Sequence, residues 1–118
     1  MKFGHIEIFV KNPIESKKFY EDLLEFEIIT VQGDNFVWLK SGDSVFPLRP
    51  GNYSSGSHAV EYGKSDIGLV LYTDNLEKTS EKLRAKGLEF KGTDGSDKCL
   101  TFTDPDGNWF QLVNPENH

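Results

Sequence analysis

The sequence has a single cysteine, Cys99, so no intramolecular disulfide can form. A lone thiol in a strand-like segment is typical of a protein from a reducing compartment. No apolar run approaches the roughly 20 residues that are needed to span a bilayer. No charged and apolar leader precedes the first predicted strand. These absences predict a cytoplasmic protein without a membrane partner.

Basic residues are also scarce, because the chain has 13 Lys and Arg against 19 Asp and Glu, which gives a net charge of −6. Neutralising phosphates requires a basic face, so nucleic acid is excluded as a partner. The chain contains no glycine-rich phosphate loop and no Cys-x-x-Cys motif. A cationic or neutral small molecule suits the acidic balance, although surplus acid is also an ordinary means of solubility.

What the chain does contain is a weak internal repeat. Leu24-Glu25-Phe26 recurs as Leu88-Glu89-Phe90, and Trp38 corresponds to Phe102, with the same offset of 64 residues. Self-similarity of this kind indicates two copies of one structural unit. Since about 50 residues with one helix cannot cover both faces of a sheet, neither copy is expected to be stable alone.

Each copy predicts a strand, a helix and three further strands. In the first copy, Asn12 caps the helix, Pro13 occupies its first position and Glu15 completes a capping box. In the second copy, Asp74 is the expected cap and Gly87 the stop. The predicted strands are 3–10, 26–32, 35–40 and 44–49 in the first copy, and 67–73, 88–92, 98–103 and 108–113 in the second. Between the copies, residues 50–65 are rich in glycine and serine and predict a loop. This loop also carries Tyr53, His58 and Tyr62, either as a lid or dimer arm or as an ordinary surface segment.

Strand alternation separates a core face from an open face. Pro105 and Gly107 predict a hairpin with a bulge, which changes the facing of the last strand. Ile6, Ile8 and Val10 are then expected in the core. The open-face residues are expected to be His5, Glu7, Phe9, Val45, Pro47, Arg49, Gly68, Val70, Tyr72, Thr101, Thr103, Trp109, Gln111 and Val113.

Three segments, residues 4–20, 81–87 and 102–108, resemble the vicinal oxygen chelate superfamily of glyoxalases, bleomycin-resistance proteins and extradiol dioxygenases. The Asp104-Pro105-Asp106-Gly107-Asn108 hairpin is the most specific part. The resemblance implies an α+β fold and one domain over residues 1–118. It would hold two βαβββ repeats, 3–49 and 66–115, whose mixed sheets curve into a cup with helices outside. It also implies a homodimer.

Enzymes of this superfamily hold a metal with the first and last strands of each repeat. By resemblance these positions are His5, Pro47, Gly68 and Gln111. Proline and glycine offer no side-chain donor, and an alignment slip from Gly68 to Ile67 offers none either. A catalytic site generally needs three protein ligands. The sequence therefore predicts no bound metal and favours a non-enzymatic function. If a divalent metal binds, His5 and Gln111 would be its ligands, completed by Glu7 or His58.

The remaining open-face residues give candidate roles in ligand binding. Glu7 is a candidate general base if desolvation raises its pKa, and otherwise a rim residue that reaches solvent. Arg49 would meet an acidic ligand group or form a salt bridge with Glu7. Phe9, Tyr72 and Trp109 could form an aromatic floor, or else a dimer interface or a core edge. The ligand-binding candidates are His5, Glu7, Phe9, Arg49, Tyr72, Thr101, Trp109 and Gln111.

Three functions follow. The first is a metal-independent small-molecule binding protein that sequesters a cationic or aromatic compound, as in the bleomycin-resistance branch. The second is a divalent-metal-dependent lyase, transferase or dioxygenase. The third is an accessory domain without a small ligand.

Overall fold

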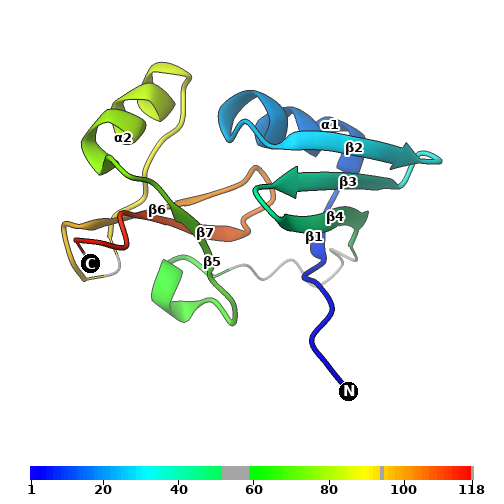
Figure 1. Ribbon diagram of the computed structural model, residues 1–118, viewed down its shortest axis with the longest axis horizontal. Coiled ribbons are helices and arrows are strands. Elements are labelled where there is room, and N and C mark those ends of the chain that lie inside the picture. The colour runs from blue at the N-terminus through cyan, green and yellow to red at the C-terminus, as the bar shows by residue number, and fades with distance from the viewer. Residues whose placement is uncertain (52–58, 94, 118) are drawn as a thin grey trace. The chain divides into compact units, whose positions relative to one another are not determined.

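A computed structural model describes residues 1–51, 59–93 and 95–117 (Figure 1). The chain has the predicted α+β character and divides into two compact units, Met1–Gly56 and Ser57–His118. Each unit contains one mixed sheet, with strand order β1-β4-β3-β2 in the first and β5-β7-β6 in the second. In both units the first and last strands are parallel neighbours, as expected of a repeat.

The first unit contains strands β1 (Ile8–Val10), β2 (Glu27–Gln32), β3 (Phe36–Ser41) and β4 (Ser44–Pro50). Its helix α1 (Pro13–Lys18) continues as the π-helix η1 (Phe19–Leu23). The predicted cap is confirmed, because Asn12 Oδ1 accepts the N–H groups of Ile14 and Glu15 at 3.1 and 3.3 Å. This bonding satisfies backbone donors that the first helical turn leaves unpaired.

The first predicted strand was too long, because only Ile8–Val10 of 3–10 pairs with β4. The parallel register would next place Glu7 beside Pro47, which has no N–H to donate to the ladder. Ile6 consequently does not enter the core, as the sequence suggested, and remains 41% exposed. Ile8 and Val10 are buried as expected.

The core of the first unit lies on one face of its sheet. Ile8 is opposite Leu48, which is opposite Val37 on the next strand, so these three side chains share a face. Leu48 and Val37 are fully buried, and α1 packs against β3 and β4. The neighbouring residues in each strand must therefore point to the other face of the sheet.

The second unit contains strands β5 (Leu69–Tyr72), β6 (Cys99–Thr103) and β7 (Trp109–Val113). Its helices are α2 (Leu76–Ala85) and the 3-10 turn η2 (Tyr62–Lys64). Within the segment predicted as a loop, 50–65, Pro50 ends β4 and Tyr62–Lys64 form η2. Gly87 follows α2 with a φ of 100°, which confirms the predicted stop.

Two predictions for this unit were wrong. The helix cap is Asn75 rather than Asp74, because Asn75 Oδ1 accepts the N–H of Lys78 at 3.0 Å. Residues 88–92 form no strand, although Lys91 N–H still donates to Thr101 O at 2.7 Å. Gly92 has a φ of 92°, and this left-handed conformation interrupts the extended backbone. The second sheet consequently has three strands where the repeat predicted four.

The predicted hairpin between β6 and β7 is confirmed. Gly107 N–H donates to Asp104 O at 3.1 Å, and Gly107 has a φ of 88°. Asp104 is 2% exposed and accepts three hydrogen bonds, from Asp106 N–H, Asn108 N–H and Asn108 Nδ2. Among the described residues, no helix has the length and apolarity that a bilayer crossing requires.

Candidate functional site

The first sheet turns a polar and aromatic surface away from its core, which we call the first open face. Phe9 lies opposite Arg49, and Trp38 opposite Pro47, so these side chains share that face. The predicted facing of Phe9, Pro47 and Arg49 is therefore confirmed. Phe9 is 49% exposed, whereas Pro47 is fully buried.

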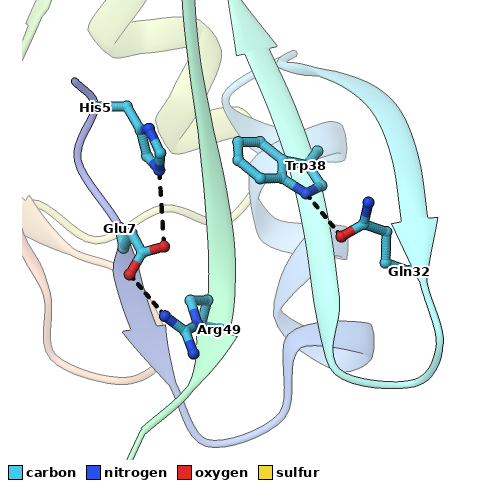
Figure 2. Close-up of polar contacts among 5 residues, drawn as sticks. All are labelled: His5, Glu7, Gln32, Trp38 and Arg49. Atoms are coloured by element: carbon cyan, nitrogen blue, oxygen red, sulfur yellow. Dashed lines mark hydrogen bonds and ion pairs between the residues drawn. The ribbon is translucent and has the colours of Figure 1, made fainter.

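Arg49 is the centre of the first open face. Its Nη1 donates to Glu7 Oε1 at 2.8 Å, and Glu7 Oε2 lies 3.7 Å from His5 Nε2 (Figure 2). The Arg49 Cζ lies 4.6 Å from the Phe36 ring centroid and 6.0 Å from that of Phe9. The Glu7–Arg49 salt bridge that the sequence left as one alternative is thus present. Guanidinium groups held on aromatic faces gain cation–π attraction in addition to their ion pair.

Trp38 extends this cluster along β3 (Figure 2). Its indole N–H donates to Gln32 Oε1 at 3.2 Å, and its ring meets His5 edge-on at 5.4 Å. Sequence reasoning missed Trp38, Phe36 and Gln32 as site residues. Alternation along 35–40 would have found Trp38 and Phe36. Since β3 pairs directly with β4, side chains opposite each other on the two strands point to the same face.

The surroundings of Glu7 shift its pKa in the direction opposite to that expected of a general base. The hydrogen bond from Arg49 lowers the pKa of the Glu7 carboxyl, and the Arg49 charge and His5 act in the same direction. Desolvation opposes these effects but is smaller than the hydrogen bond. The raised pKa suggested from the sequence is therefore wrong, and the geometry favours a charged, positioning role for Glu7.

This lowered pKa predicts a specific pH dependence. Because the folded-state pKa lies below the unfolded-state value, Glu7 stabilises the fold above its ordinary pKa of about 4.3 and loses that contribution as pH falls. The difference in Tm between the protein and its Glu7→Gln variant should be constant above about pH 6 and should shrink below about pH 4. Thermal unfolding across pH at low salt measures this. A difference that does not change with pH would contradict the assignment, and Glu15→Gln is the exposed control.

The second sheet also has the predicted facing. Val70 and Thr101 both lie opposite Gln111, and Thr103 lies opposite Trp109. However, Thr101, Trp109 and Gln111 are 0%, 3% and 6% exposed, so these candidate ligand contacts are covered. Tyr72, on the same face, is 74% exposed and is the accessible aromatic there.

Tyr62 explains part of this covering. A Cβ atom added to Gly68 would lie 2.6 Å from Tyr62 Cζ and 2.9 Å from Tyr62 Cε1. The Tyr62 ring also meets the Trp109 ring edge-on at 6.4 Å, and the Trp109 indole N–H donates to Ala59 O at 2.8 Å. The sequence placed Tyr62 on a loop and gave it no position in the sheet. A phenol ring therefore occupies the space beside Gly68.

The residues present do not fit the metal that the superfamily implies. The four positions supply one imidazole and one amide, from His5 and Gln111, while Pro47 and Gly68 supply no side-chain donor. His5 already faces Glu7 and Trp38, and Tyr62 lies where a side chain at Gly68 would project. Within the described part of the chain, no group of at least three His, Cys, Asp or Glu side chains could hold an ion.

Two residues of the predicted loop, Tyr53 and His58, lie outside the described residues. The prediction that His58 could complete a metal site is therefore untested.

One curated relative is a manganese-dependent 2,3-dihydroxybiphenyl 1,2-dioxygenase from Geobacillus genomosp. 3. It is 29% identical over 119 residues, which cover 94% of this chain and 36% of the relative. This chain therefore spans about a third of the length of that relative.

Solved structures share the fold at low identity. Lactoylglutathione lyase from Agrobacterium tumefaciens has a TM-score of 0.73 and 14% identity, over 98% of this chain and 95% of its own. The antibiotic binding protein TnmS3 from Streptomyces sp. CB03234 has a TM-score of 0.70 and 20% identity, over 97% of this chain and 98% of its own. The fosfomycin resistance protein FosX from Listeria monocytogenes, complexed with Mn(II) and sulfate, has a TM-score of 0.71 and 17% identity, over 96% of this chain and 89% of its own.

The family model covers residues 2–112 and therefore most of both units. It includes the open-face residues of the first unit and the β6–β7 hairpin of the second. This chain belongs to the Glyoxalase/Bleomycin resistance protein/Dioxygenase superfamily.

Proposed function

We propose that this chain is a cytoplasmic small-molecule binding protein that holds a planar aromatic ligand without a metal. The observation that carries the proposal is the first open face, where Arg49 lies between Phe9 and Phe36 and is fixed by Glu7. Rigid aromatic side chains beside a few fixed polar groups are typical of small-molecule sites. The antibiotic binding protein TnmS3, which has the same fold, supports this class of function.

The ligand class is aromatic rather than cationic. The carboxylate that a cation would need, that of Glu7, already accepts a hydrogen bond from Arg49 and faces His5. Binding a cation there would break an ion pair and place like charges together. A neutral or anionic ring can instead stack on Phe9, which is 49% exposed, beside the Arg49 charge.

A fluorescence titration with two planar probes tests this proposal. Anionic 8-anilinonaphthalene-1-sulfonate should bind, and cationic proflavine should bind at least about tenfold more weakly. Phe9→Ala should weaken the binding of the anionic probe about fivefold to tenfold, because one aromatic contact contributes about 1 kcal/mol.

Val45→Ala is the matched control, since Val45 lies on the same face and is 38% exposed. Equal losses in the two variants would refute a specific aromatic contact at Phe9. If neither probe binds and metal-free small molecules give no stabilisation, an accessory domain without a small ligand replaces the proposal.

A second candidate, a metal-dependent enzyme, is favoured by the similarity to the manganese-dependent dioxygenase of Geobacillus genomosp. 3. A metal present at 100 times its Kd should stabilise the folded state by about 2.7 kcal/mol. That corresponds to a Tm increase of roughly 10 °C for a domain of this size. We expect Mn²⁺, Zn²⁺, Ni²⁺ and Fe²⁺ each to shift the Tm by less than about 2 °C. A stoichiometric metal that is lost in His5→Ala would establish the enzyme in place of the binding protein.

Homodimerisation also belongs to the proposal. Several apolar residues in and next to β5 are exposed, with Ile67 at 64%, Val70 at 47% and Tyr72 at 74%. Adjacent exposed apolar side chains often mark a protein interface. Sedimentation velocity should give a dimer that Val70→Glu converts to a monomer, whereas a monomer at all concentrations would exclude this part of the proposal.

A further inference from the structure

We propose that the outer edge of β2 (Glu27–Gln32) binds a short, extended, basic peptide, which joins the first sheet as an additional strand. We call this surface the β2 edge. It lies wholly in the first unit. It goes beyond the proposed function, because it uses backbone groups and the core side of β2 rather than the first open face.

The strand β2 is the longest edge strand of the two sheets. Among the strands that the structure describes, β2 pairs with β3 alone and is outermost in its sheet (Figure 1). It has six residues, whereas the other edge strands, β1, β5 and β6, have three, four and five. The edge of β6 is also covered, because Lys91 N–H donates to Thr101 O and Thr101 N–H donates to Gly92 O. Since the N–H and C=O groups of a strand edge can pair with another chain, β2 offers the longest template for a further strand.

The side chains of β2 leave the first core open at this edge. Ile28 lies opposite Leu39, and Val31 lies opposite Val37. Leu39 and Val37 are fully buried, whereas Val31 is 39% exposed. The core face therefore continues onto β2 but is not closed there. An apolar side chain on an added strand would remove the exposed surface of Val31 from water.

A bulge in β2 favours a short peptide over the edge of another folded sheet. Ile28 and Thr30 lie opposite consecutive residues of β3, so Ile29 between them is an extra residue, and it is 49% exposed. A bulge bends its strand and increases the local twist. A long, flat strand in another folded protein matches such an edge poorly, whereas a flexible peptide can follow it.

The charge around the β2 edge selects a basic partner. Between Lys18 and Lys40 the sequence has no basic residue, and its five acidic residues there are all exposed: Glu21, Asp22, Glu25, Glu27 and Asp34. Lys40 lies opposite Glu27 and offsets one of these charges. Pairing with β2 of a second copy would bring like charges together, whereas a basic peptide would bring opposite charges together.

Three capped heptapeptides test this inference. In the first, acetyl-KVKVKVK-amide, lysine and valine alternate, so an extended form has one basic and one apolar face. In the second, glutamate replaces lysine, and in the third every peptide nitrogen of the first is methylated. Measured by fluorescence anisotropy, the first peptide should bind at least about tenfold more tightly than the other two, because it alone has both the positive charge and the N–H groups. Equal binding of the first peptide and either of the others would overturn the inference.

Two valines of the first sheet provide matched variants. Val31→Lys places a charge on the core side of the β2 edge and should weaken binding of the lysine peptide at least about tenfold. Val45→Lys adds the same charge at a residue that is 38% exposed but lies on β4, between two other strands, and should change binding less than about twofold. Equal losses in the two variants would overturn the inference.

Thermal unfolding shows whether each variant is folded. If Val31→Lys does not fold, Glu27→Lys takes its place, because it changes only an exposed charge at the same edge. It should weaken binding of the lysine peptide at least about threefold, since it replaces an attraction by a repulsion. Unchanged binding to Glu27→Lys would overturn the inference.

Amide hydrogen exchange locates the bound peptide. With saturating lysine peptide, amides of β2 should exchange at least about tenfold more slowly, whereas those of β5, an edge strand of the second sheet, should be unchanged. Protection of β5 in place of β2 would overturn the inference. Protection of β2 that rises with protein concentration without peptide would overturn it in favour of a second copy. Because no variant alters Phe9 or Arg49, failure here is distinguishable from failure of the proposed function.

Discussion

Phe102→Ala should lower the free energy of unfolding by about 4 kcal/mol, as is typical when a buried aromatic side chain is truncated. Phe102 is fully buried and stacks on Phe110, with ring centroids 5.2 Å apart and an interplanar angle of 7°. It also meets Phe90 edge-on at 5.8 Å. The substitution therefore leaves a cavity beside two rings that cannot both move to fill it.

Urea-induced unfolding followed by circular dichroism measures this loss. Val60→Ala is the control, because Val60 belongs to the same unit but is 79% exposed, and its truncation should change stability by less than about 0.5 kcal/mol. Comparable losses in the two variants would show that the Phe102 stack is not a centre of the second core. A variant that fails to fold would instead show no cooperative unfolding transition in urea.

Asp104→Ala should lower the free energy of unfolding by about 3 kcal/mol, because hydrogen bonds to a charged acceptor contribute about 1.5–3 kcal/mol each and removal leaves their donors unpaired. Asp104 Oδ1 accepts from Asp106 N–H at 2.9 Å and from Asn108 N–H at 2.8 Å. Its Oδ2 accepts from Asn108 Nδ2 at 2.9 Å, and the side chain is almost fully buried.

Thermal unfolding should show this loss as a Tm decrease of about 10 °C or more. Asp104→Asn keeps one acceptor oxygen for the two backbone donors, so it should recover about half of the lost stability. Asp97→Ala, at an exposed position, should have little effect. Equal stability of Asp104→Ala and Asp97→Ala would contradict the structural role of this hairpin.

Local signals in the sequence were strong at turns and helix ends. Asn12 and Pro13 predicted the start of α1, and Pro105 with Gly107 predicted the β6–β7 hairpin, because these residues restrict their own backbone. The second helix shows how such signals fail. Asp74 and Asn75 are both good caps, and the choice between them depends on which side chain reaches the N–H of Lys78.

Strand lengths were predicted less well, because a strand exists only where a partner strand supplies hydrogen bonds. Residues 3–7 are as apolar as a strand, yet Pro47 in the partner offers no N–H, and pairing begins at Ile8. Residues 88–92 have the right composition, but Gly92 turns the backbone away from an extended form. Neither partner geometry nor φ is encoded by hydrophobic alternation.

The candidate site was predicted in its facing but not in its contacts. Alternation placed Phe9, Arg49 and Gln111 on open faces, and the registers agree. It could not choose between an acidic ligand and Glu7 as the partner of Arg49, because these residues are 42 positions apart and their distance is set by the packing of β1 on β4. The pKa of Glu7 followed from that choice, and so the sign of its shift was predicted wrongly.

The sequence by itself determined the family, the repeat, most of the elements and the lack of side-chain donors at Pro47 and Gly68, because these depend on residue identity and local backbone preference. Only the tertiary structure decided that Glu7 is held by Arg49, that Trp38 and Phe36 join the first open face, and that Tyr62 fills the space beside Gly68. These are contacts between different strands, or between a turn and a strand. The alternation within one strand does not predict them. Their energies depend on distances of a few ångströms, which the order of residues does not specify until the chain has packed.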